Sequence, residues 1–154
     1  MRIILINFIT LIFVGCTSSR WCADHIDCQD ERFSSSKLYY QSFSSDLLIE
    51  FLRIHNTTYG YVKMLSRKIK NENIILVVNG TEHHAHGTLQ KEGYIFTFAP
   101  DTMNLLLESL AHNHQVKLFI DDQFFTIDLE RFTQEYKKFQ AKYYLSDFAP
   151  TNLR

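Results

Sequence analysis

The sequence predicts one α+β domain with a mainly antiparallel β-sheet and two helices in its C-terminal half. Short stretches with strand-like patterns are separated by turn residues, and Asn79-Gly80 joins two such stretches as a two-residue hairpin turn. Two later stretches instead carry apolar residues three and four positions apart, the period of a helix. The sequence has 154 residues, and removing residues 1–15 leaves 139, enough for one domain with its own core.

The first sixteen residues predict export from the cytoplasm. Arg2 precedes an apolar run, residues 3–14, which is too short for a spanning helix of about 20 residues but typical of a signal peptide. The run ends in Phe13-Val14-Gly15-Cys16, which resembles the lipobox of bacterial lipoproteins. By that resemblance residues 1–15 are removed, Cys16 carries acyl chains such as palmitate, and the protein is anchored in the inner or outer membrane of a bacterial envelope.

Two alternatives to lipidation stay open. The motif has Phe13 where Leu is favoured and Val14 where a smaller residue is common. Ordinary cleavage near Ser18 would release a soluble secreted protein, which could act at a host interface, and an uncleaved leader would act as an anchor.

Composition excludes nucleic acid as an expected partner. Sixteen Lys and Arg residues nearly balance seventeen Asp and Glu residues, so the chain lacks the basic excess that DNA- and RNA-binding domains carry. Phe and Tyr are abundant and Gly and Pro are scarce, which favours a packed globular domain over a disordered chain.

Residues 16–37 are polar and rich in serine, and we predict that they form a tether between membrane and domain. Within them, Cys22 and Cys28 are expected to form a disulfide in an oxidising compartment. Two free thiols, or a zinc site with His25, are the alternatives. Trp21 is interpreted as a packing residue or an interfacial anchor.

Residues 38–145 are predicted to form the domain, beginning with a strand over 38–43. Residues 47–54 and 61–69 are predicted to pair as a hairpin across the turn-rich stretch 55–60. A short helix capped by Asp46 is the alternative.

A three-stranded meander is predicted next, at the centre of the sheet. Its strands cover residues 74–78, 81–89 and 94–98, with Asn79-Gly80 and Lys91-Glu92-Gly93 as the turns.

The C-terminal third is predicted to run helix, hairpin, helix. Pro100 and Asp101 open a helix that ends near Asn113, residues 116–120 and 124–129 pair across Asp121-Asp122, and residues 146–154 are a tail. The apolar positions of the two helices are Met103, Leu106, Leu107 and Leu110, then Phe132, Tyr136, Phe139 and Tyr143. In its pattern of apolar residues this third is similar to small exported invasion-associated proteins of the IalB type.

Two His-x-His pairs are the candidate metal ligands. On a continuous strand, His84 and His86 would project from one face about 7 Å apart, while His83 would face the other way. If the helix end with His112 and His114 folded beside that strand, four imidazoles could hold Zn or Cu. The alternative is that these are exposed polar positions, with the later pair stabilised at a helix C-terminus.

No motif in the sequence predicts an enzyme. A Gly-rich phosphate loop, HExxH and GxSxG are all missing from it. Ser44, Ser45 and Asp46, or Asp121, Asp122 and Asp128, have the residue types of a catalytic group without a diagnostic spacing. We therefore expect a non-enzymatic protein-interaction module on a membrane, with no cofactor, and a histidine-based metal-binding protein as the alternative.

Overall fold

The computed structural model describes residues 20–26, 35–42 and 44–141, which fold into strands and two α-helices. The α+β prediction is confirmed. In chain order the elements are β1 Arg20–Ile26, β2 Ser35–Ser42, β3 Leu47–Ile54, β4 Thr57–Met64, β5 Ile75–Val78, β6 Thr81–His84, β7 Gly87–Gln90, the 3-10 turn η2 Lys91–Gly93, β8 Ile95–Phe98, α1 Pro100–Ala111, β9 Val116–Ile120, β10 Gln123–Thr126 and α2 Phe132–Gln140.

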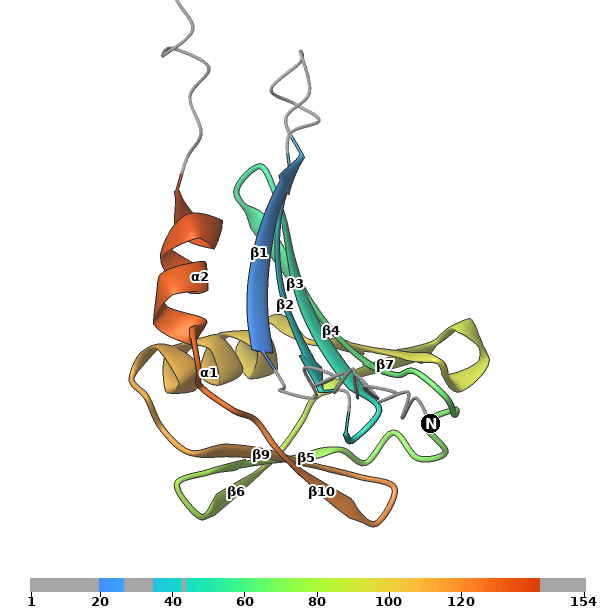
Figure 1. Ribbon diagram of the computed structural model, residues 1–154. Coiled ribbons are helices and arrows are strands. Elements are labelled where there is room, and N and C mark those ends of the chain that lie inside the picture. The colour runs from blue at the N-terminus through green and yellow to red at the C-terminus, as the bar shows by residue number, and fades with distance from the viewer. Residues whose placement is uncertain (1–19, 27–34, 43, 142–154) are drawn as a thin grey trace, which may run out of the picture.

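The strands form two antiparallel sheets. The larger has the order β1-β2-β3-β4-β8-β7 and the smaller has the order β10-β9-β5-β6. The smaller sheet crosses below one end of the larger one, and α2 lies beside β1 (Figure 1). The core fills the space between the sheets and the helices, and its fully buried large side chains include Trp21, Tyr40, Phe51, Phe96 and Phe132.

The predicted tether is wrong over residues 20–26 and 35–37. Residues 20–26 form β1, which pairs with β2 along its whole length, and Trp21 is fully buried. The packing interpretation of Trp21 is therefore confirmed. The polar and serine-rich residues of this stretch predict a tether, yet a strand here needs only Trp21 and Ala23 on the face that meets the core.

The predicted meander is also wrong in its middle and in its position. The chain leaves the smaller sheet after His84 and enters the larger sheet at Gly87, so residues 81–89 make two strands instead of one. Ala85 N–H still donates to Ile74 O, while His86 O accepts from Ala99 N–H, which marks the crossing point. Both β6 and β7 are edge strands.

The hairpin of β3 and β4 is confirmed over the helix alternative. The two strands pair from Leu47–Met64 to Ile54–Thr57, so the turn takes only two residues and β4 begins earlier than predicted. Asp46 has a φ of 61° and therefore caps no helix. Its carboxylate instead accepts hydrogen bonds from the backbone N–H and the hydroxyl of Ser66.

Two-residue turns with left-handed backbone close both hairpins of the smaller sheet. Asn79 and Gly80 have φ of 48° and 84°, and Asp121 and Asp122 have φ of 47° and 65°. Positive φ at both positions defines the turn type whose twist matches paired strands. Both turns lie where the sequence predicted them. Of the predicted tail, residues 146–154 lie outside the described part of the chain.

Glu135 joins α2 to the free edge of β1. The residue is 3% exposed. Its carboxylate accepts a 3.0 Å hydrogen bond from the Ala23 N–H and forms ion pairs with Lys138 at 2.9 Å and Arg131 at 3.2 Å. Burial raises the pKa of this carboxyl, but the hydrogen bonds from Lys138 and Ala23 and the two cationic charges outweigh burial and leave the pKa lowered. An edge strand is thus covered by a helix, which protects its backbone from pairing with other chains.

We expect Trp21→Ala to lower the free energy of unfolding by about 3–5 kcal/mol, because it opens a cavity among packed rings. Chemical denaturation of the full chain measures this. Tyr59→Ala, at a side chain 43% exposed on β4, is the control and should cost less than about 1 kcal/mol. An equally small loss in Trp21→Ala would contradict the place of β1 in the domain.

We expect the carboxylate of Glu135 to make stability depend on acid pH. Its folded pKa lies below the ordinary 4.5, so its contribution is complete above that value and is lost as the pH falls through the folded pKa. Glu135→Gln should destabilise the protein by about 1.5–3 kcal/mol at neutral pH, because it removes hydrogen bonds to a charged group. The wild-type and variant unfolding free energies should converge in acid, whereas the exposed Glu82→Gln should track the wild type throughout. Parallel curves for wild type and Glu135→Gln would contradict this role.

Candidate binding groove

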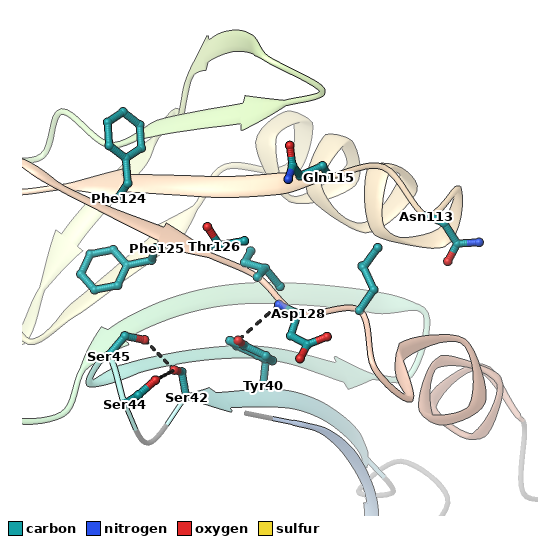
Figure 2. Close-up of a pocket in the computed structure, with 12 residues that line it drawn as sticks. Tyr40, Ser42, Ser44, Ser45, Asn113, Gln115, Phe124, Phe125, Thr126 and Asp128 are labelled. Atoms are coloured by element: carbon teal, nitrogen blue, oxygen red, sulfur yellow. Dashed lines mark hydrogen bonds between the residues drawn. The ribbon is translucent and has the colours of Figure 1, made fainter. Parts of the chain in front are cut away.

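A groove runs along β10, the edge strand of the smaller sheet. A hollow of about 640 Å³ is lined on one side by the consecutive residues 124–129 and on the other by the end of β2 and the turn after it (Figure 2). A second hollow of about 520 Å³ continues it past Gln123 and shares Ser44, Ser45, Phe124 and Phe125 with the first. The two hollows therefore form one groove along the whole strand.

The backbone of β10 alternates between its partner strand and this groove. Ile127 N–H donates to Val116 O, and in an antiparallel ladder such pairs recur every second residue. Phe125 and Gln123 accordingly bond to β9. The N–H and C=O groups of Phe124 and Thr126 point the other way, toward the groove, where no strand of the described chain pairs with β10.

Tyr40 closes one end of the groove. Its hydroxyl accepts a 3.3 Å hydrogen bond from the Asp128 N–H, the next backbone group on the groove side of the strand (Figure 2). The Asp128 carbonyl in turn accepts a 2.7 Å hydrogen bond from Trp21 Nε1. The chain after β10 is therefore held to the larger sheet, while β10 itself stays open.

Serine hydroxyls form the wall opposite β10. Ser45 donates a 2.6 Å hydrogen bond to Ser42 Oγ, and the hydroxyls of Ser42 and Ser44 lie 3.3 Å apart (Figure 2). On the strand side, Phe125 is buried, whereas Phe124 is 62% exposed and its ring lies 4.7 Å from that of Phe119. The groove thus offers hydroxyls, unpaired backbone groups and an aromatic pair at its rim.

The acidic residues considered as catalytic groups hold loops in place. Asp121 pairs with Arg67 at 3.0 Å and accepts hydrogen bonds from the N–H groups of Lys70 and Asn71. Asp128 Oδ1 accepts from the Glu130 N–H. These contacts give both carboxylates a structural role beside the groove.

The structure does not gather the four predicted histidine ligands into one site. His84 donates from Nδ1 to Asn73 Oδ1 at 3.2 Å, and His112 donates from Nδ1 to Glu108 O at 2.8 Å. The rings of His112 and His114 stack with centroids 5.8 Å apart. Across the described residues, no group of three or more His, Cys, Asp or Glu side chains is arranged to hold a metal ion.

The crossing between the sheets explains why the first histidine pair separates. His84 ends β6, whereas His86 lies past the crossing, just before β7, and donates from Nδ1 to Asp101 Oδ2 in the first turn of α1 at 3.0 Å. The Thr102 N–H, and after it the His86 imidazole, lower the pKa of the Asp101 carboxyl. The shared strand face that the sequence predicted requires a continuous strand, and Ala85 interrupts it.

Cys22 lies half-buried on β1 opposite Tyr39. Burial raises the pKa of Tyr39, and Cys22 and Asp24 raise it further. Cys28 and the lipid-attachment residue Cys16 lie outside the described residues. Cys22 lies four residues, or about 13 Å, from Ile26 at the end of the extended strand β1. A disulfide with Cys28 would therefore need the chain to turn back toward Cys22 directly after Ile26. The disulfide stays a prediction.

A serine–histidine contact that sequence reasoning missed supports α2. Ser36 Oγ lies 2.9 Å from His25 Nδ1 and also accepts from Arg53, while His25 Nε2 lies 3.1 Å from Lys138 O. Both ring nitrogens of His25 therefore face groups that hold the helix. His25 and Lys138 are 113 positions apart in sequence, so no motif could have revealed this link.

No family model matches the chain, and no significant match is found among curated proteins or solved structures. No helix among the described residues is long and apolar enough to cross a membrane. The lipobox-like motif and the similarity to IalB-type proteins stay predictions.

We expect Tyr40→Phe to loosen the closed end of the groove. Loss of the hydroxyl leaves the Asp128 N–H without its partner, which should cost about 1 kcal/mol of stability and speed hydrogen exchange at that amide. NMR-detected exchange measures this directly. Tyr61→Phe, on the outer face of β4, is the control, and equal exchange at Asp128 in both variants would contradict the bond.

Proposed function

We propose that the protein is a bacterial envelope lipoprotein, anchored through Cys16, that acts as a non-enzymatic protein-interaction module. The observation that carries the binding role is the groove along β10, which combines unpaired backbone groups with an exposed aromatic ring. The serine hydroxyls of its wall bond to one another and Asp128 Oδ1 accepts from the Glu130 N–H, an arrangement that supports binding over catalysis.

The start of β1 limits how far the domain could stand from a membrane. Three residues lie between Cys16 and Arg20, so the Cα atoms of these two residues can be at most about 14 Å apart. Acyl chains on Cys16 would therefore hold the domain against the lipid surface, with burial of each CH₂ contributing about 0.8 kcal/mol.

The groove lies at the end of the larger sheet that the anchor would reach. Arg20 pairs with Gln41, which lies between the groove-lining residues Tyr40 and Ser42. A partner bound in the groove would thus be held near the membrane. This placement suits the capture of a segment from another envelope protein.

We expect Cys16→Ala to abolish membrane association in a bacterium that processes lipoproteins. The wild type should partition with membranes as a species that starts at Cys16 and carries added acyl mass, because that cysteine would supply the lipidated N-terminus. Intact mass spectrometry with membrane fractionation measures both properties.

Cys22→Ala is the matched control and should keep the wild-type mass shift and partition. A soluble, unmodified product from both wild type and Cys16→Ala would contradict the lipid anchor and support secretion instead. Membrane-bound protein of unprocessed mass from both would identify an uncleaved leader.

A further inference from the structure

We propose that β10 binds an extended, positively charged peptide segment of a partner protein by strand addition. This inference rests on the proposed binding role of the groove and names what the groove takes. Peptides that add a strand to a sheet edge bind chiefly through their backbone.

The hydrogen-bonding pattern of β10 determines the shape of the ligand. Phe124 and Thr126 each direct one N–H and one C=O into the groove, two residues apart. An antiparallel strand places residues opposite both and exchanges both hydrogen bonds with each. In the added strand, the residue between these two lies opposite Phe125 and faces the serine wall, where a small or polar side chain fits.

The two ends of the groove limit how much chain can enter. At Asp128 the strand edge is already bonded to Tyr40 Oη, so the added strand stops there. Along β10 the turn at Ser44 and Ser45 stands across the groove. That wall leaves room for a single extended segment and opposes pairing with the whole sheet of a second copy.

Side chains on the outer face select the sequence of the segment. Residues opposite Phe124 and Thr126 point to the face that carries the exposed ring of Phe124 beside the half-buried Phe119, so an apolar residue packs there. Among the described residues, no cation pairs with Asp122 or Asp128, whereas Arg67 is paired with Asp121. The groove therefore favours lysine or arginine on the flanks of the segment.

Proline substitution tests the backbone contact with a matched control. Thr126→Pro removes a groove-facing N–H from one edge of the smaller sheet, at a position where proline is tolerated because the group faces away from the partner strand. Glu82→Pro makes the same change on the other edge. Ala85 donates to Ile74, so by the same alternation Glu82 points its N–H away from β5.

The probe is a phage-displayed library of random nonapeptides, selected on the purified full chain. We expect enriched peptides that alternate apolar with small or polar residues and carry basic flanks. Synthetic copies should bind wild type and Glu82→Pro within about twofold of each other, and Thr126→Pro at least tenfold more weakly. Hydrogen exchange at Phe124 and Thr126 should slow in the complex.

A second measurement keeps the test decisive if Thr126→Pro does not fold. N-methylation of the selected peptide at a residue opposite Phe124 or Thr126 should abolish binding to wild type, whereas N-methylation of the intervening residue should spare it. Failure to enrich any peptide, equal binding to both proline variants, or protection confined to other strands would overturn the proposal. A wild-type dimer that Thr126→Pro abolishes would overturn it in favour of pairing between copies.

The peptide test and the anchor test fail separately. Peptide binding is measured on purified protein whether it is recovered from membranes or from the medium. Peptide binding without lipidation would contradict the proposed anchor and support the peptide groove. Lipidation without peptide binding would support the anchor and contradict the peptide groove.

Discussion

Burial of Trp21 is the contact on which the arrangement of the domain depends. Its ring lies 5.2 Å from Tyr40, 6.3 Å from Phe51 and 4.9 Å from Phe132, so it touches the larger sheet and α2 at once. Its indole N–H also holds the Asp128 carbonyl beside the groove. A buried indole needs such a partner, because an unbonded polar group in the core is costly. One side chain on the edge strand therefore aligns the sheet, the last helix and the end of β10.

Local signals in the sequence predicted the elements well. Asn79-Gly80 and Asp121-Asp122 adopt the left-handed turns that their side chains tolerate, and Pro100 opens α1. The signals failed where a strand depends on neighbours. β1 lies in a polar, serine-rich stretch and depends on the helix and the strand that pack against it. Nothing in the sequence at Ala85 indicates a crossing between the two sheets. Helix α2 was predicted because its apolar spacing is complete within a few turns.

The groove was beyond prediction for a related reason. Its walls come from Tyr40 and the serines after it, from Asn113 and Gln115, and from residues 124–129, which approach only in the folded chain. Whether a strand is an edge depends on the order of all strands, which no local pattern encodes. Histidine spacing, by contrast, is visible in the sequence, and it overestimated what the fold brings together. Residue types in the sequence identified candidate metal ligands, whereas the groove along β10 was identified only from the strand pairing in the structure.

The contact between β1 and α2 joins the two ends of the described chain, since Ala23 bonds to Glu135 and Trp21 packs on Phe132. Contacts between residues so distant in sequence form slowly, because closing so long a loop costs more chain entropy than forming local contacts. During synthesis β1 therefore cannot pack against α2 until α2 has been made. The backbone edge of β1 stays uncovered until then. A chain built in this way cannot complete its fold from an N-terminal part alone.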